Sequence, residues 1–373
     1  MRFVFAGLFL LAVLTAACGV QENNTRKNTS APADTGAVSG NANRVMLTDA
    51  LGRQVTFEQL PLRIVVAGKA TSLLADALYM FPQAAERLVA ISTAFQGVDF
   101  LPIVDPGFKE KTILAGQAGA EQIAAVNPDV VLMKSYLAGK LGKTIEEIGI
   151  PVVYLSLETP DEYLSETTSL GKLFGDEARA GEIKTFYRTR LDLVKQKVDS
   201  IPEKNKPSVL VLQHTIKGGQ TAFRVPPADW MQTELVSLAG GKPVWKEDVN
   251  GSGWAVVTLE QIALWNPSQI YLIDYFDDPE KAMQDFIREP SMAMLDAVRE
   301  HQVFAFPKDT TSWDQADTRW ILGLLWLAKH IHPELFQTLD MDEAFRSFYQ
   351  TLYRMDDDTI ENQMIPRLSG IYP

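Results

Sequence analysis

The sequence predicts an α/β protein in which one long helix joins two similar lobes. Three observations predict this fold: short apolar runs that alternate with helical patterns, an internal repeat of domain-sized period, and one uninterrupted helical stretch near the middle of the chain. The chain has 373 residues, of which 46% are hydrophobic. A globular chain of this length exceeds the usual size of a single hydrophobic core, so two domains are expected.

The first 18 residues have the pattern of an export signal. Met1 and Arg2 give a positive start, residues 3–14 are apolar, and small residues stand directly before Cys18. This run is shorter than the roughly 20 apolar residues that span a bilayer, and it ends in small residues, which favours a signal peptide over a transmembrane helix. Cys18 is the only cysteine of the chain, so it cannot form an internal disulfide.

The position of Cys18 resembles a bacterial lipobox, in which cleavage leaves an N-terminal cysteine that carries lipid. Thr15 stands where leucine is usual, with Leu14 one place earlier, so an ordinary cleaved signal with an incidental cysteine is the alternative. Residues 19–44 are rich in Asn, Thr, Ser, Ala and Gly, and such a segment buries too little apolar surface to offset its ordering entropy. We expect it to be a flexible tether that holds an extracytoplasmic body at a membrane.

The first α/β lobe is predicted over residues 45–174. Strands are expected at residues 63–67, 88–92, 130–133 and 152–155, with a helix at residues 73–81. Continuous apolar strands that alternate with helices are typical of a mostly parallel sheet covered on both faces.

Residues 175–205 are predicted to contain the connecting helix. Residues 176–201 include no proline and only one glycine, and apolar residues recur at steps of three or four from Ile183 to Val198. This spacing places them on one helical face, and Pro202 supplies a stop. Such a helix is roughly 35–40 Å long, which is enough to bridge two lobes.

The second lobe is predicted over residues 206–336, with strands at residues 209–213, 270–273 and 303–306, and residues 337–373 form a helical extension. Residues 121–128 (EQIAAVNP) and 260–267 (EQIALWNP) agree at six of eight positions. Each copy reads as a short helix, an Asn-Pro break and a strand, which indicates a pair of similar lobes.

Composition and motifs exclude several classes of function. The net charge of −12 argues against a nucleic-acid partner, because phosphate backbones are bound by clustered lysine and arginine. The sequence has no G-x-S-x-G elbow, H-E-x-x-H, Walker loop or C-x-x-C, so neither an enzyme nor a cofactor is expected. The four histidines lack ligand spacing, so no metal site is expected. An exported enzyme and a surface adhesion lipoprotein are remote alternatives.

Several segments, in order along the chain, resemble the substrate-binding proteins of ABC importers for iron–siderophores, haem and cobalamin. These segments are residues 47–53 (LTDALGR), 127–131 (NPDVV), 238–244 (LAGGKPV), 265–267 (WNP) and 319–336. The fold of that family is two Rossmann-like α/β lobes joined by a single long α-helix, with the ligand between the lobes. The resemblance implies a monomeric extracytoplasmic lipoprotein that delivers a small-molecule ligand to an ABC permease and contacts membrane lipid through Cys18.

Loops that follow strands give the candidate ligand contacts, because ligands of open α/β sheets bind outside the carboxyl ends of the strands. In the first lobe these contacts are Lys69, Thr71, Ser72, Gln96, Lys134 and Tyr136. In the second lobe they are His214, Phe223, Arg224, Trp230, Tyr275, Trp313 and Arg319. The structural alternatives are helix capping for Thr71 or Ser72 and core packing for Trp230.

Glu121 and Glu260 open the two repeated helices. An acid in the first helical turn stabilises the helix dipole by under about 1 kcal/mol, which is the structural interpretation. In the family that the chain resembles, one surface glutamate of each lobe pairs with arginines of the permease. The resemblance therefore implies that Glu121 and Glu260 dock the protein.

The ligand expected from this resemblance is an iron chelate, either a siderophore or haem, because such cargo dominates the family. Histidine, aromatic and arginine side chains in the second-lobe loops suit a chelate. Cobalamin and an oxyanion such as molybdate or tungstate are the alternatives. An oxyanion needs only backbone N–H groups, hydroxyls and a cation such as Lys69 in a small cleft, so pocket volume separates it from a chelate.

Overall fold

The computed structural model describes residues 44–93, 98–217 and 220–372. Cys18, the proposed tether and Gln96 lie outside these residues. Residues Asn43–Pro373 form one compact unit. In the described part of this unit, no helix is long and apolar enough to cross a membrane.

The first sheet has five parallel strands in the order β5-β4-β3-β6-β7. Its strands are β3 (Ile64–Val66), β4 (Leu88–Ser92), β5 (Thr112–Leu114), β6 (Val130–Lys134) and β7 (Val152–Leu155). All residues of β3, β6 and β7 are buried, as strands covered on both faces require. A separate antiparallel hairpin, β1 (Val45–Thr48) and β2 (Gln54–Phe57), precedes the sheet. The four strands predicted for this region are present, and β5 is an additional one.

Six helices among the described residues accompany this sheet. They are α1 (Thr71–Tyr79), α2 (Ala84–Arg87), α3 (Leu101–Val104), α4 (Ala120–Ala124), α5 (Lys143–Glu147) and α6 (Pro160–Phe174). Local capping signals are clearest at α6. At the start of α6, Thr159 and Glu162 form a reciprocal capping box, and Pro160 occupies the first turn. The helix ends at Gly175, whose φ of 69° places it in the left-handed region.

The long helix between the two sheets is α7 (Glu177–Val198), with 22 residues and a length of roughly 33 Å. The Asp176 side chain caps it by accepting a hydrogen bond from the Arg179 backbone N–H. Its buried face includes Ile183, Tyr187 and Val194, as the spacing of apolar residues predicts. This face packs against α6 and α12.

The second sheet has the order β11-β9-β8-β12-β13, with β10 paired to the start of β8. Its strands are β8 (Ser208–Lys217), β9 (Gln220–Val225), β10 (Lys242–Pro243), β11 (Ala255–Val257), β12 (Gln269–Ile273) and β13 (Val303–Ala305). Strands β8, β12 and β13 are parallel, whereas β8, β9 and β11 are antiparallel. The sheet is therefore mixed, which corrects the placement of Phe223 and Arg224 in a long loop.

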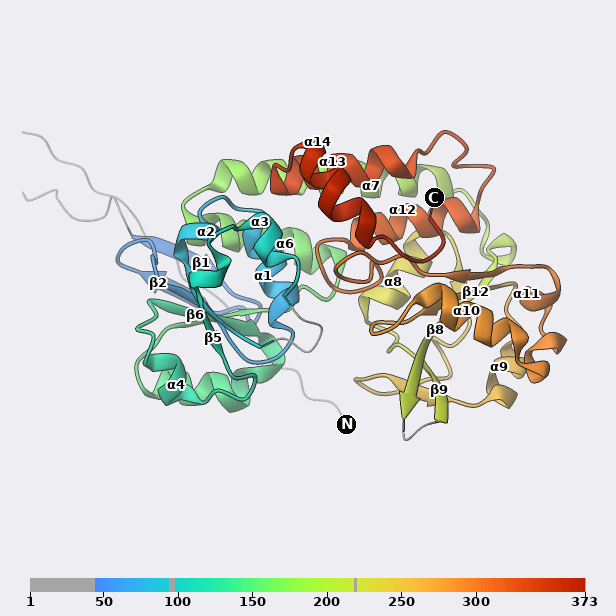
Figure 1. Cartoon of the computed structure of the whole chain (residues 1–373), viewed down its shortest axis with the longest axis horizontal. Coiled ribbons are helices and arrows are strands. Elements are labelled where there is room, and N and C mark those ends of the chain that lie inside the picture. The colour runs from blue at the N-terminus through green and yellow to red at the C-terminus, as the bar shows by residue number, and fades with distance from the viewer. Residues whose placement is uncertain (1–43, 94–97, 218–219, 373) are drawn as a thin grey trace, which may run out of the picture. The chain divides into compact units, whose positions relative to one another are not determined.

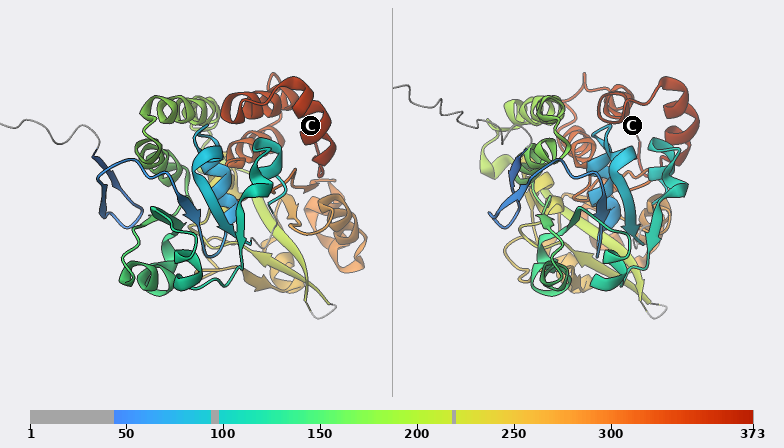
Figure 2. Two further views of the ribbon diagram at one scale, coloured as in Figure 1. Left: turned by 60° about the vertical axis from the view of Figure 1, so that its left-hand side comes forward. Right: turned by 90° about the vertical axis from the view of Figure 1, so that its left-hand side faces the viewer.

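The helices of the second half are α8 (Met231–Leu238), α9 (Leu259–Trp265), α10 (Pro279–Arg288), α11 (Asp296–Arg299), α12 (Trp320–Ile331), α13 (Met341–Tyr353) and α14 (Asp357–Thr359). Helix α13 hydrogen-bonds to α7 through Arg190 and Ser347, and α12 packs on both, so these helices lie side by side in Figures 1 and 2. The repeated segments fold alike, because Asn127 and Asn266 both have positive φ, 47° and 36°, between a short helix and a buried strand.

Arg319, directly before α12, is completely buried and joins the two halves of the unit. Its guanidinium lies 2.8 Å from the Asp76 carboxylate on α1 and 2.7 Å from those of Asp309 and Asp317. Burial and the nearby Asp317 carboxylate raise the pKa of Asp76 well above its usual value. We call these four residues the Arg319 junction. It connects the first-sheet half to the strand-end loop that follows β13.

Candidate functional site

The carboxyl ends of β12 and β13 border a small polar cavity of about 300 Å³, which we call the hydroxyl pocket. Its lining residues are Asp99, Tyr275, Phe276, Lys308, Asp309, Thr310, Thr311, Ser312, Gln315 and Arg367. Tyr275 and Phe276 lie in the loop that follows β12, and residues 308–312 follow β13. Asp99 comes from the first-sheet half, before α3. The pocket thus lies where strand-end loops of the second sheet meet the first half, the usual position for a ligand.

The charges around the hydroxyl pocket favour an anion. The Asp309 carboxylate is neutralised by Arg319 and also accepts hydrogen bonds from Trp313 and Tyr349. Lys308 and Arg367 bring two cations to the lining, against the single exposed carboxylate of Asp99. Burial lowers the pKa of Lys308, whose ammonium donates to the backbone carbonyls of Asp274 and Asp277.

Three aromatic side chains adjoin the hydroxyl pocket through Tyr275, and we call them the aromatic group. The ring of Trp254 packs edge to face on Trp230, with centroids 5.9 Å apart, and on Tyr275 at 6.1 Å. The Tyr275 hydroxyl donates to the Asp314 carboxylate at 2.7 Å, and Gln232 donates to the same oxygen at 3.1 Å. These hydrogen bonds fix the orientation of the Tyr275 ring.

Two polar side chains on β8 and β9 each have a buried atom without a protein partner. Gln213 and Arg224 are register partners on β8 and β9, so their side chains emerge on one face. The Arg224 Nε and the Gln213 Oε1 are buried without a hydrogen bond, and no described carboxylate forms an ion pair with Arg224. Burial and Asp314 raise the pKa of Tyr275 well above its usual value, and the nearby Arg224 cation opposes this rise. Since an unsatisfied buried group is costly, this pair is suited to a partner supplied by a ligand.

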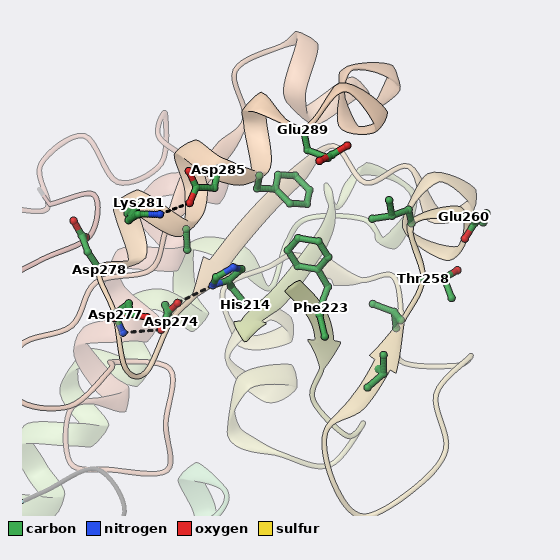
Figure 3. A pocket seen from close by; sticks show the side chains of 16 residues that line it. His214, Phe223, Thr258, Glu260, Asp274, Asp277, Asp278, Lys281, Asp285 and Glu289 are labelled. Carbon is green, nitrogen blue, oxygen red and sulfur yellow. Dashed lines mark hydrogen bonds and ion pairs between the residues drawn. The ribbon is translucent and has the colours of Figure 1, made fainter. Parts of the chain in front are cut away.

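The opposite face of the same hairpin borders a larger hollow of about 1080 Å³, which we call the acidic pocket (Figure 3). His214 and Phe223 pair in the register, and neighbouring strand residues alternate between faces, so they point away from Gln213 and Arg224. Six carboxylates line the acidic pocket: Glu260, Asp274, Asp277, Asp278, Asp285 and Glu289.

The charged groups of the acidic pocket leave it strongly negative. Its lysine, Lys281, is paired with Asp285, and His214 lies 2.8 Å from Asp274. Although burial opposes the change, hydrogen bonds from His214 and backbone N–H groups lower the pKa of Asp274. Among the described residues no cluster of His, Cys, Asp and Glu has an arrangement that would hold a metal ion. The acidic pocket therefore repels anions and suits basic groups.

The predicted first-lobe contacts divide into exposed and buried side chains. Lys69 and Tyr136 are exposed after β3 and β6. Thr71 is fully buried and donates to the Ser92 carbonyl, and Lys134 is 1% exposed and bound to Glu158 at 2.8 Å. The structure therefore corrects the prediction for Thr71 and Lys134. Ser72 is also buried, at 8% exposure, and α1 has no side-chain cap, so neither Thr71 nor Ser72 caps the helix.

The predicted second-lobe contacts fall into three places. Arg224, Trp230 and Tyr275 come together beside the hydroxyl pocket. His214 and Phe223 line the acidic pocket instead. Trp313 and Arg319 are completely buried with protein partners, so neither has surface available to a ligand, which corrects both predictions.

Sequence reasoning missed several residues of the site. Thr310, Thr311 and Ser312 follow the predicted strand at residues 303–306, so the rule applied to the other strand ends also points to them. Gln213 was placed at a strand end, but its pairing with Arg224 requires the hairpin. Trp254 lies in a loop whose sequence carries no signal of its position.

Glu166 on α6 holds the strand-end loop that follows β7. Its carboxylate accepts hydrogen bonds from the backbone N–H groups of Ser156 and Leu157, at 2.9 and 3.2 Å. Burial raises the pKa of Glu166 to about 8, with help from Glu162.

This pKa predicts how stability depends on pH. Between the ordinary pKa of 4.5 and about 8, the folded state retains a proton that the unfolded state releases. The contribution of Glu166 to stability is thus fully present below pH 4.5 and is lost as pH rises to about 8. Relative to Glu166→Gln, the wild type should lose about 1.4 kcal/mol of unfolding free energy per pH unit in this window. Urea unfolding of both proteins from pH 5 to 9 tests this, and parallel curves would contradict it.

Glu121 and Glu260 are exposed in the first turns of α4 and α9. The carboxylate of Glu260 accepts hydrogen bonds from the Glu260 backbone N–H and from the Thr258 side chain, and both lower the pKa of Glu260. Glu260 also lies at the border of the acidic pocket.

Comparison with known proteins supports the resemblance found in the sequence. The family model described as periplasmic binding protein matches residues 64–310. The chain is 24% identical over 332 residues to the molybdate-binding protein MolA of Haemophilus influenzae, covering 83% of this chain and 91% of that protein.

Solved structures share the fold. A periplasmic solute binding protein from Veillonella parvula superposes with a TM-score of 0.68 at 22% identity, covering 87% of this chain and 97% of that one. Molybdate-bound MolA of Haemophilus influenzae has a TM-score of 0.66 at 20% identity, with 83% and 98% covered. CeuE of Helicobacter pylori, in a Ni–His complex, has a TM-score of 0.68 at 19% identity, with 86% and 99% covered.

The family match spans well over half of the chain, and the predicted fold of two α/β halves with a long helix is present. The resemblance to substrate-binding proteins of ABC importers is confirmed. Membership of this class also implies an extracytoplasmic location. The chain belongs to the periplasmic binding protein family.

Proposed function

We propose that this protein captures a compact metal oxyanion, such as molybdate or tungstate, in the hydroxyl pocket and delivers it to an ABC importer. The observation that carries the proposal is the pocket itself: about 300 Å³, placed at the carboxyl ends of β12 and β13, with three consecutive hydroxyl side chains and two cations in its lining. Hydroxyls, backbone N–H groups and cations are the groups that bind tetrahedral oxyanions.

The volume of the pocket favours an oxyanion over the iron chelate expected from the sequence. Ligand pockets range from about 300 to 1000 Å³, and a chelate of several hundred daltons needs the upper part of that range. The larger acidic pocket has enough volume for a chelate, but its six carboxylates repel an anionic one. The similarity to a molybdate-binding protein over most of both chains adds support for an oxyanion.

An anionic iron chelate is the second candidate, and the aromatic group favours it. Trp230, Trp254 and Tyr275 offer flat apolar surface beside the unpaired Arg224, an arrangement that suits a planar anionic ligand. Cobalamin requires a still larger groove than either candidate.

Calorimetric titration of the purified protein with molybdate, tungstate, sulfate, ferric siderophores, haem and cobalamin separates these ligands. We expect tight binding of molybdate and tungstate and weaker binding of sulfate. Because all three are tetrahedral dianions, the comparison with sulfate tests selectivity at equal charge. Thr311→Val should weaken oxyanion binding, and Phe223→Leu in the acidic pocket should not. Tight binding of a chelate without a response to molybdate would overturn the proposal in favour of the second candidate.

We further propose that Glu121 and Glu260 dock the protein on the permease. Their replacement by alanine together should abolish most transport while ligand affinity stays unchanged, because rim charges set register and association rate. The carboxylates of the acidic pocket beside Glu260 would extend this negative surface toward permease arginines. Uptake of radiolabelled ligand in cells, with Glu110→Ala and Glu177→Ala together as an equally charged control, checks this. Normal uptake by the Glu121 and Glu260 double variant would place docking elsewhere.

We also propose that Cys18 carries lipid and that the mature protein is a monomer. A further proposal, that it has no catalytic activity, is supported by the solute-binding role of its relatives. Labelling of cells with an alkyne fatty acid should tag the wild type and leave Cys18→Ser unlabelled. Equal labelling of both proteins would exclude lipidation at this cysteine.

A further inference from the structure

A groove between α6 and α7 collects positive charge on a protein that is acidic overall. Its volume is about 560 Å³, and we call it the basic groove. Its lining residues are Thr48, Asp161, Leu164, Ser165, Thr168, Ser169, Lys172, Lys184 and Arg188. It shares no lining residue with the hydroxyl pocket or the acidic pocket. It is therefore a separate site, to which the proposed function assigns no role.

The cations of the basic groove are not neutralised by the protein. Lys172, Lys184 and Arg188 form no ion pair with any described carboxylate, and Lys184 donates instead to the Thr168 hydroxyl at 2.7 Å. The one acidic residue of the lining, Asp161, lies in the first turn of α6, where it stabilises the helix dipole. Three cations against one carboxylate contrast with the net charge of −12 for the chain.

The arrangement of these cations favours a bound anion. Lys184 and Arg188 are four residues apart on α7, so they lie on one helical face, where two like charges are mutually destabilising. Lys172 adds a third charge from α6, which packs directly against α7. Lys172 and Lys184 are half-buried and Arg188 is exposed, so the groove is open to a large partner. An anion between the helices removes this repulsion.

The start of the described chain forms one wall of the basic groove. Residue Arg44 leads into β1, and Thr48 at the end of β1 lines the groove. The Ser169 hydroxyl on α6 donates to the Thr48 carbonyl at 2.7 Å and so fixes β1 beside the groove. The segment that leads back to Cys18 thus enters the folded body at the other end of β1, where Arg44 lies about 13 Å along the strand from Thr48.

We propose that the basic groove binds the phosphate of an anionic phospholipid headgroup at the membrane surface. The inference rests on the proposed anchoring through Cys18, because a lipidated cysteine and a proposed flexible tether of residues 19–44 would place this wall at a root-mean-square distance of about 25–30 Å from the anchor. A lysine or arginine near an anionic leaflet strengthens binding about fivefold, so three give about 100-fold.

Vesicle binding by the mature full chain carrying Cys18→Ser tests the groove separately from the lipid anchor. We expect binding to vesicles of phosphatidylcholine with 30% phosphatidylglycerol, chosen here as the anionic probe, to exceed binding to pure phosphatidylcholine, and to fall with added salt. Changing Lys172, Lys184 and Arg188 to glutamine should weaken binding about 100-fold while oxyanion titration and cooperative unfolding stay unchanged. Lys109→Gln, Lys140→Gln and Lys242→Gln together remove the same charge elsewhere and should leave vesicle binding intact.

Three outcomes would overturn this proposal: undiminished binding by the groove variant, equal loss in the control variant, or binding of inorganic phosphate without binding of anionic vesicles. Failure of the oxyanion titration would refute the proposed ligand and leave the vesicle result standing. Failure of fatty-acid labelling at Cys18 would show that the tether does not hold the basic groove near the bilayer. Each failure is thus distinguishable from the others.

Discussion

Replacement of Arg319 by methionine is expected to lower the free energy of unfolding by about 3–5 kcal/mol. The substitution leaves the carboxylates of Asp76, Asp309 and Asp317 buried without their cation. It also removes the guanidinium from the face of the Phe100 ring, whose centroid lies 4.4 Å away. Urea unfolding followed by tryptophan fluorescence measures the loss.

Arg346→Met is the matched control for this prediction. Arg346 also contacts two carboxylates, Asp342 and Glu361, but these are exposed, so the loss should be below about 1 kcal/mol. Arg319→Lys should fall between the two, because an ammonium cannot reproduce the planar donor set of a guanidinium. Equal stability of the Arg319→Met and Arg346→Met variants would show that the Arg319 junction contributes nothing beyond a surface pair.

Replacement of Arg224 by methionine is expected to weaken binding of an anionic ligand by about 10- to 100-fold, the value of a hydrogen bond to a charged group. Stability should not fall with it, because the buried Arg224 Nε has no protein partner to lose. Calorimetry for affinity and urea unfolding for stability separate the two effects. A structural role for Arg224 would lower both quantities together.

Arg288→Met provides the control for Arg224, since it removes an exposed positive charge from the same half of the protein. Its affinity should stay close to that of the wild type, apart from a small long-range effect that salt screens. An equal loss of affinity in both variants would mean that net charge, not contact with the ligand, explains the result.

The strands were predictable wherever an apolar run was buried on both faces. Residues 88–92 and 152–155 coincide with β4 and β7, because such runs have no competing pattern. Strand β5 was not predicted, since it has three residues and is mostly exposed. The β8–β9 hairpin was not predicted, although Gly218-Gly219 between its two strands is a hairpin signal.

The candidate site was predictable where position after a strand was sufficient, as for Tyr275. It was not predictable where a distant partner decides exposure. Arg319 follows the same polar loop as Thr310, yet it is buried because Asp76 lies beside it from 243 residues away in sequence. Lys134 likewise lies at the end of a strand, β6, but it is buried and its ammonium is paired with Glu158. Sequence position gives the edge of the sheet, whereas long-range ion pairs decide which side chains face a ligand.

Adjacent residues of β8 serve two different surfaces, since Gln213 pairs with Arg224 on one face of the hairpin and His214 pairs with Phe223 on the other, in the acidic pocket. Because side chains alternate along a strand, a shift of one residue exchanges the two faces. An insertion or deletion in this hairpin during evolution would therefore place an arginine among the carboxylates and a histidine beside the cargo. Relatives that change cargo while keeping the acidic surface are expected to differ here by substitution alone, with the length of the hairpin preserved.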